Sequence, residues 1–139
     1  DWRDDLVNAG VELYELRADA AIQSIVDIPP VKGAFVGLHT KAMVADRTLS
    51  FIGSMNFDPR SFTINTEAGV FIKSKGLGED LARVMKRDMD PQNAWQVLLD
   101  EDGKPYWVNS DETVYKQPAR DGKQRIMDKI FKMFPKEQY

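Results

Sequence analysis

One stretch of eighteen residues constrains this chain of 139 residues more than any other feature. Residues 39–56 follow the pattern H-x-K-x4-D-x6-G-S-x-N, and its histidine, His39, is the only histidine in the chain. Six residue types at fixed offsets rarely occur together by chance, so the pattern indicates a functional motif. Local signals predict strands over 35–44 and 48–52, joined by a hairpin turn at 45–47.

Two basic side chains begin the motif, and both are expected to project from one face of its first strand, because residues i and i+2 share a face. An imidazole can attack phosphorus while a fixed ammonium stabilises the phosphoryl oxygens. His39 and Lys41 therefore indicate nucleophilic attack on a phosphodiester. Further along, Gly53 allows close backbone approach, and the Ser54 hydroxyl and Asn56 amide can donate hydrogen bonds to phosphate.

Two acidic residues complete the candidate site. A nucleophilic histidine needs an acceptor on its second ring nitrogen, and Glu67, just before a predicted strand, is the candidate. The alternative for Glu67 is an ordinary solvated residue at a strand end. Asp46 is the acidic residue of the motif, but its position in the predicted turn favours a structural role. No His, Asp and Glu cluster stands at metal-ligand spacing, so we expect no metal and no other cofactor.

The rest of the chain interleaves predicted helices and strands. Helices are predicted over 2–8, 59–62, 78–89 and 123–134, and strands over 11–17, 68–72, 95–100 and 106–109, with a loop over 18–34. The alternation predicts an α/β (α+β) fold, a mixed β-sheet flanked by helices, in a single domain over 1–139 with a hairpin at 95–109. The core is expected to include the apolar run 68–72 as a buried strand, and the side chains of Phe51, Ile52, Phe71 and Ile72.

The net charge of −3 is unevenly distributed along the chain. Residues 1–115 carry a charge of −7, and the tail over 116–139 carries +4. An acidic body disfavours a broad nucleic-acid-binding face, so no nucleic-acid partner is expected. The basic tail also carries an apolar stripe, which is typical either of a helix on an anionic membrane surface or of a helix packed on the sheet. No apolar run approaches the roughly 20 residues that cross a bilayer.

The motif resembles the HKD signature of the phospholipase D superfamily, whose members normally carry two copies. This chain carries one copy and so resembles one HKD half-domain. The segment N-x-D-x-R-S at 56–61, followed by N-x-E at 65–67, is similar to the pattern of bacterial cardiolipin synthases. Residues 9–15 and the closing segment 134–139 also look like that family. We therefore expect the chain to be the C-terminal catalytic half of a larger two-motif protein.

The resemblance implies a phosphatidyl transfer through a phosphohistidine intermediate. One histidine attacks a phospholipid, and the other protonates the departing alcohol and then activates phosphatidylglycerol, which gives cardiolipin. Which histidine takes which role stays open. The candidate catalytic residues are His39, Lys41, Asp46 and Glu67, and the candidate phosphate-binding residues are Ser54, Asn56 and Arg60. Arg60 is equally well explained as a salt-bridge partner.

The resemblance also implies partners and a location. Phosphatidylglycerol and phosphatidylethanolamine are the expected phospholipids, at the membrane surface. The expected protein partner is the N-terminal HKD half of the same protein, or a second copy of the chain. The expected location is the bacterial inner membrane, peripheral or on its cytoplasmic face.

Three other functions stay open on the sequence. A phospholipase D hydrolase would differ only in using water as acceptor, which releases phosphatidic acid. A phosphodiesterase or nuclease is disfavoured by the acidic body of the chain. A non-catalytic membrane-docking half-domain is disfavoured because the motif residues are all intact.

Overall fold

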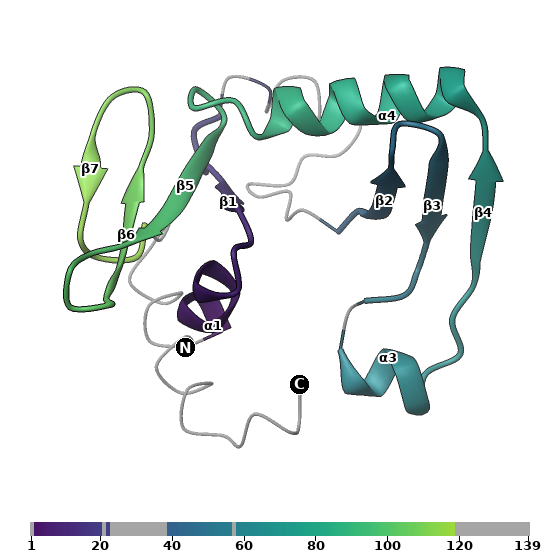
Figure 1. The fold of residues 1–139 in the computed structure, drawn as a ribbon, viewed down its shortest axis with the longest axis horizontal. Coiled ribbons are helices and arrows are strands. Elements are labelled where there is room, and N and C mark those ends of the chain that lie inside the picture. The colour runs from purple at the N-terminus through teal and green to yellow at the C-terminus, as the bar shows by residue number, and fades with distance from the viewer. Residues whose placement is uncertain (1, 21, 23–38, 57, 119–139) are drawn as a thin grey trace. The chain divides into compact units, whose positions relative to one another are not determined.

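The structure, a computed structural model, describes residues 2–20, 22, 39–56 and 58–118. The chain divides into two compact units, each with its own antiparallel sheet (Figure 1). The α/β class expected from the sequence is confirmed, because helices and strands alternate along the chain. The predicted tail helix over 123–134 and the start of the strand predicted from residue 35 lie outside the described residues.

The first unit is built on a four-stranded sheet with the strand order β1-β5-β6-β7. Its elements are α1 (Trp2–Asn8), β1 (Leu13–Leu16), β5 (Ala94–Leu99), β6 (Pro105–Val108) and β7 (Thr113–Val114). The helix α1 ends where predicted, at Gly10, which has a φ of 85°. The amide of Gly10 donates to the Val7 carbonyl at 2.9 Å, and that of Val11 donates to Leu6 at 3.0 Å. This is the Schellman motif that stops a helix at glycine.

Two tryptophans and a valine form the core of this unit. Trp95, Val97 and Trp107 are buried, and Val97 lies opposite Trp107 in the β5–β6 register. The hairpin predicted over 95–109 is therefore confirmed. The indole nitrogen of Trp107 donates to the Glu15 carboxylate at 3.1 Å, and Arg3 pairs with the same carboxylate. The polar edge of the buried ring is thereby satisfied.

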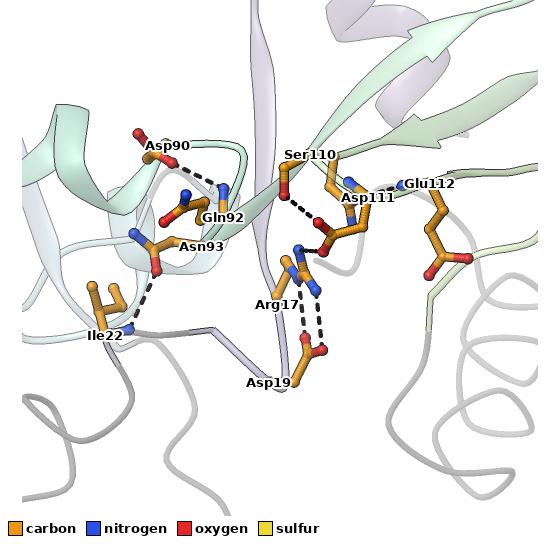
Figure 2. A network of polar contacts seen from close by, with 10 residues as sticks. Arg17, Asp19, Ile22, Asp90, Gln92, Asn93, Ser110, Asp111 and Glu112 are labelled. Atoms are coloured by element: carbon orange, nitrogen blue, oxygen red, sulfur yellow. Dashed lines mark hydrogen bonds and ion pairs between the residues drawn. The ribbon is translucent and has the colours of Figure 1, made fainter.

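A cationic side chain at the end of β1 joins parts of this unit that are distant in sequence (Figure 2). The Arg17 guanidinium makes two bonds of 3.0 Å to Asp19 and one of 2.8 Å to Asp111. It also lies over the Trp95 ring, 5.6 Å from the ring centroid. These bonds hold the pKa of both carboxyls below the usual range. Arg17 thus fixes the β6–β7 connection against the chain that follows β1.

Asn93 makes a second connection within this unit (Figure 2). Its side chain is buried, its carbonyl oxygen accepts from the Ile22 amide at 3.2 Å, and its Nδ2 donates to the Arg87 carbonyl at 2.9 Å. Its backbone carbonyl accepts from the Arg17 amide at 2.8 Å. One amide side chain therefore satisfies backbone groups from two separate segments.

The second unit carries the motif on a three-stranded sheet with the order β2-β3-β4. Its elements are β2 (Lys41–Ala45), β3 (Leu49–Gly53), α3 (Pro59–Thr63), β4 (Gly69–Lys73) and α4 (Lys75–Asp88), whose last residues belong to the first unit. The predicted hairpin is confirmed, with β2 and β3 paired from end to end. Asp46 and Arg47 have φ values of 49° and 53°, as a type I′ turn requires.

The apolar run that forms β4 is a strand as predicted, but its predicted burial is wrong. Val70 is 55% exposed and Phe71 is 68% exposed. Ile52, on β3, is also exposed, whereas Phe51 is buried as expected. The described residues leave these side chains uncovered, both on the edge strand β4 and on the central strand β3. An apolar pattern indicates a strand that can be buried, and the covering layer decides whether it is.

Gly78 allows α4 to pack directly against the hairpin turn of the motif. The Ser74 hydroxyl accepts from the Leu77 amide at 3.3 Å and caps the helix, so α4 begins at Lys75 and not at the predicted residue 78. A Cβ on Gly78 would lie 2.4 Å from the backbone carbonyl of Arg47. No other residue type fits at position 78 without moving the helix away from the turn.

This contact predicts opposite effects for two alanine substitutions on α4. Gly78→Ala is expected to lower the free energy of unfolding by about 2–3 kcal/mol, because the added methyl group overlaps backbone atoms. Gly76→Ala is the matched control, since a Cβ there meets no atom within 4 Å, and it is expected to be neutral or stabilising by up to about 1 kcal/mol. Urea unfolding of both variants measures the difference, and equal stabilities would contradict the packing described.

Candidate functional site

Three candidate side chains come from one end of the β2–β3–β4 sheet, the end away from the hairpin turn. Lys41 is paired with Gly53, and Gly53 is paired with Gly69. The pairing continues for one more residue, because the Ser54 amide donates to the Ala68 carbonyl at 2.8 Å. Lys41, Ser54 and Glu67 therefore mark what we call the motif end of the sheet.

Ser54 and Glu67 are joined directly. The Ser54 hydroxyl donates to Glu67 Oε2 at 2.6 Å and accepts from the Ala68 amide at 3.0 Å. The first bond has the length of a charge-assisted hydrogen bond. It holds the pKa of the Glu67 carboxyl below its usual range, and Ser61 and Asn65 act in the same direction while the Asp58 charge opposes them. In this arrangement the single proton of the Ser54 hydroxyl is directed to Glu67.

His39 and Lys41 lie at the start of β2. The His39 side chain is exposed, and Lys41 Nζ donates to the His39 carbonyl at 3.0 Å. The ammonium is therefore held beside the backbone of the histidine. Within the part of the chain that the structure describes, no hydrogen bond joins the imidazole to Glu67. The predicted role of Glu67 as the acceptor for His39 stays a prediction.

A pair of glycines at the motif end was not recognised as a unit from the sequence. A Cβ on Gly69 would lie 2.4 Å from the Phe51 ring, and one on Gly53 would lie 2.7 Å from the same ring. The ring of Phe51 therefore covers both glycines in the row that contains Lys41. This explains why the glycine before Ser54 is needed for packing as well as for approach of a ligand.

The helix α3 lies between Ser54 and Glu67 in the chain, and its Ser61 is buried. Asp58 caps the helix as predicted, and its Oδ1 accepts from the Ser61 amide at 2.8 Å. The buried Ser61 hydroxyl lies 3.4 Å from Asp58 Oδ2 and also contributes to the lowered pKa of Glu67. The sequence analysis gave Ser61 no role, although a serine three residues after an N-cap aspartate was the available signal.

The remaining candidates lie apart from these contacts. Asn56 and Arg60 are exposed, Asn56 after β3 and Arg60 in α3. Asp46 lies in the hairpin turn, at the opposite end of β2 from Lys41. Five residues of strand separate the two ends by about 16 Å, so Asp46 belongs to the turn and not to the motif end.

The described ranges hold neither a cluster of metal ligands nor a helix that could span a membrane. Between residues 2 and 118, leaving aside those outside the description, no three His, Asp or Glu side chains gather as metal ligands. In the same residues, every helix is too short or too polar to cross a bilayer.

The comparison with protein families agrees with this arrangement of motif, hairpin and capped helix. The family profile described as cardiolipin synthase, phospholipase D-like domain, matches residues 2–89, which is more than half of the chain. The chain belongs to this family of phospholipase D-like domains.

Similar curated proteins carry related names. Cardiolipin synthase C of Escherichia coli is 35% identical over 98% of this chain, and cardiolipin synthase A of Yersinia pseudotuberculosis is 30% identical over 80%. An uncharacterized protein of Helicobacter pylori is 34% identical over 70% of the chain. The chain spans only 30%, 19% and 18% of the lengths of these three relatives, respectively. No solved structure matches the chain.

The bond between Ser54 and Glu67 predicts a titration change. Ser54→Ala is expected to raise the pKa of Glu67 toward its usual value, because the hydroxyl that stabilises the carboxylate is removed. The bond favours the folded state above the pKa of an unfolded glutamate, and this contribution is lost as the pH falls through the lower folded pKa. Carboxyl-carbon NMR measures the shift. Ser74→Ala, which removes a hydroxyl that caps α4, is the control. An unchanged Glu67 titration in Ser54→Ala would remove the assignment.

Proposed function

We propose that this chain is one catalytic half of a cardiolipin synthase that transfers a phosphatidyl group to phosphatidylglycerol through a phosphohistidine. The observation that carries the proposal is the motif end of the sheet, which holds the hydrogen-bonded pair Ser54 and Glu67 and, on β2, Lys41 beside the backbone of His39. The proposal is supported by the family membership and by relatives named cardiolipin synthase.

In the first step, an imidazole nitrogen of His39 or of the second motif's histidine attacks the phosphorus of a phospholipid. A phosphorus–nitrogen bond forms, and the phosphorus–oxygen bond to the donor's alcohol breaks. The other histidine gives its proton to the departing alkoxide. Lys41, whose ammonium donates to the His39 carbonyl at 3.0 Å, has the role of stabilising the charge that develops on the phosphoryl oxygens.

In the second step, the histidine that gave up its proton takes one from a hydroxyl group of phosphatidylglycerol. The resulting oxygen nucleophile attacks the phosphohistidine, the phosphorus–nitrogen bond breaks, and the first imidazole is regenerated. Glu67 and Ser54 act as positioning residues in this proposal, because their bond fixes the end of β3 from which Asn56 and α3 follow. Asn56 and Arg60 contact the phosphate, and Asp46 maintains the turn.

The same site would also support hydrolysis. The two reactions differ only in the acceptor, which is a lipid hydroxyl for the synthase and water for a phospholipase D. The acceptor would be selected by residues that exclude water from the phosphohistidine, and these include the partner half. A location at the bacterial inner membrane, peripheral or on its cytoplasmic face, is part of the proposal.

Removal of the nucleophile is the direct test. In the full-length protein, His39→Ala is expected to lower cardiolipin formation from phosphatidylglycerol and phosphatidylethanolamine vesicles by at least about 10³-fold, because either proposed role of the imidazole is lost. Mass spectrometry of the lipid products measures the loss. Lys75→Ala, an exposed cation on α4, is the control and is expected to retain activity.

The products decide between the alternatives. Phosphatidic acid in place of cardiolipin would identify a hydrolase. Full activity in His39→Ala would overturn the catalytic assignment. If the wild type converts no phospholipid, plasmid nicking by the wild type would identify a nuclease, and its absence would leave the non-catalytic half-domain.

We further propose that the site is completed by a second HKD half, from the same protein or from another copy of the chain. The chain holds one motif and spans 30% of the length of cardiolipin synthase C. The sheet that carries the motif also exposes apolar side chains on β3 and β4, as expected for a surface that meets a partner.

Association of the 139-residue chain tests this assembly. Sedimentation velocity is expected to show dimers forming as concentration rises, with lipid turnover present only where dimers are present. Phe71→Ser is expected to weaken dimerisation by about tenfold or more. Tyr115→Ser, which removes a side chain of similar exposure from the first unit (72% against 68%), is the control. A strictly monomeric chain with full activity would contradict the requirement for a second half.

A further inference from the structure

We propose that α3 is a membrane-contact element, which inserts Phe62 and Ile64 among lipid headgroups and so brings the motif end of the sheet to the phosphate. This inference rests on the proposed lipid substrate. Phe62 is 60% exposed and lies near the end of a helix of only five residues, and Ile64, the C-cap of that helix, is 74% exposed. We refer to these two residues as the α3 tip.

The α3 tip is attached firmly to the site. Asp58 caps the helix, and the segment that contains α3 begins after Ser54 and ends at Glu67, two residues that are joined by a hydrogen bond of 2.6 Å. A short helix held in this way cannot move far from the motif end of the sheet without breaking these bonds. Any surface that the tip enters is therefore brought close to the groups proposed to bind phosphate.

The backbone of α3 is suited to a partly apolar medium, where an unpaired amide is costly. Pro59 has no amide hydrogen, and the Ser61 amide donates to the Asp58 side chain. The amides of Phe62 and Ile64 donate to the carbonyls of Asp58 and Arg60, at 3.2 Å and 2.8 Å. The Thr63 hydroxyl donates to the Pro59 carbonyl at 2.6 Å. These donors of the segment that enters the headgroup layer thus have partners within the chain.

The unit that carries α3 is the more basic of the two units, which favours contact with an anionic surface. Residues 39–86 carry seven Lys and Arg against five Asp and Glu, which gives +2. The described residues of the first unit, in contrast, carry five against twelve, which gives −7. Arg60 is exposed on α3 itself, next to the apolar tip. Apolar side chains beside a cation are the usual composition of an interfacial contact with anionic lipid.

The other exposed apolar residues of this unit differ in kind. Val70 and Phe71 lie along an edge strand, whose unpaired backbone groups suit a protein partner and not a lipid layer. The α3 tip offers no such edge. We therefore assign the strand edge to the second half of the enzyme and the α3 tip to the membrane.

The test uses the full-length protein with the double substitution Phe62→Ser and Ile64→Ser. Sedimentation with vesicles of phosphatidylglycerol and phosphatidylethanolamine is expected to show binding weakened at least about tenfold, because two apolar side chains no longer insert. Turnover of the vesicle lipid is expected to fall in parallel. Turnover of dihexanoyl phosphatidylglycerol, supplied as a dissolved monomer, is expected to stay within about twofold of the wild type.

Two further variants make the result specific. Tyr115→Ser removes an equally exposed aromatic ring from the first unit and is expected to leave vesicle binding unchanged. Ile64→Leu keeps an apolar tip and is expected to retain binding. An equal thermal midpoint for the wild type and the double variant confirms that the fold is kept.

The outcomes separate this inference from the proposed function. Unchanged vesicle binding in the double variant would overturn the membrane contact. Equal losses on vesicles and on dissolved lipid would also overturn it, and would assign the tip to the site or to the partner half. If the wild type binds vesicles but converts no phospholipid, and the double variant does not bind, the membrane contact stands and the transferase proposal falls.

Discussion

The pairing of β3 with β4 is the constraint on which the candidate site depends. Its last hydrogen bond joins Ser54 to Ala68, and this places the Ser54 hydroxyl within 2.6 Å of Glu67 although thirteen residues separate them in sequence. The two strands can approach in this row because both paired residues, Gly53 and Gly69, lack a side chain and the Phe51 ring takes their space. A side chain at either glycine would shift the ends of β3 and β4 and the segments that are connected to these ends.

From this pairing, the rest of the site follows in short steps. The chain leaves β3 at Ser54, and α3 begins five residues later, at Pro59, under the cap of Asp58. After α3 the chain reaches Glu67, whose carboxylate accepts from the Ser54 hydroxyl at 2.6 Å. The loop and helix between the two strands are therefore closed at both ends, and the residues proposed to meet phosphate and membrane are carried on a segment with little freedom to move.

Local patterns in the sequence predicted much of the fold. The hairpin at Asp46, the cap at Asp58 and the glycine stop after α1 were each readable, because each depends on a few adjacent residues. The two-residue strand β7 was not, since Thr113 and Val114 form no pattern of their own and pair only because β6 is adjacent. The exposure of β4 also escaped prediction, because hydrophobicity shows what a strand can bury and not what covers it.

The sequence predicted candidate residues for the site but not the contacts between them. The motif identified His39 and Lys41 by spacing alone, but it assigned Ser54 to phosphate and Glu67 to the histidine, whereas the structure joins Ser54 and Glu67 to each other. Such a bond depends on the register between two strands, which is a long-range property. The partners of Arg17, from 2 to 94 residues away, are of the same kind.

The hairpin turn gives the spacing of the motif a geometric meaning. Lys41 and Gly53 are direct partners, and the turn at Asp46 and Arg47 lies between them, so the intervals of four and six residues measure the two arms of one hairpin. An insertion of one residue in either arm would shift the strand register by one residue. The side chains of that arm would then project from the opposite face of the sheet. His39 and Lys41 would then point away from the row of paired residues that contains Gly53 and Gly69. The spacing of the motif therefore specifies the lengths of the two strands as well as a set of reactive groups, and its aspartate marks the turn between the strands.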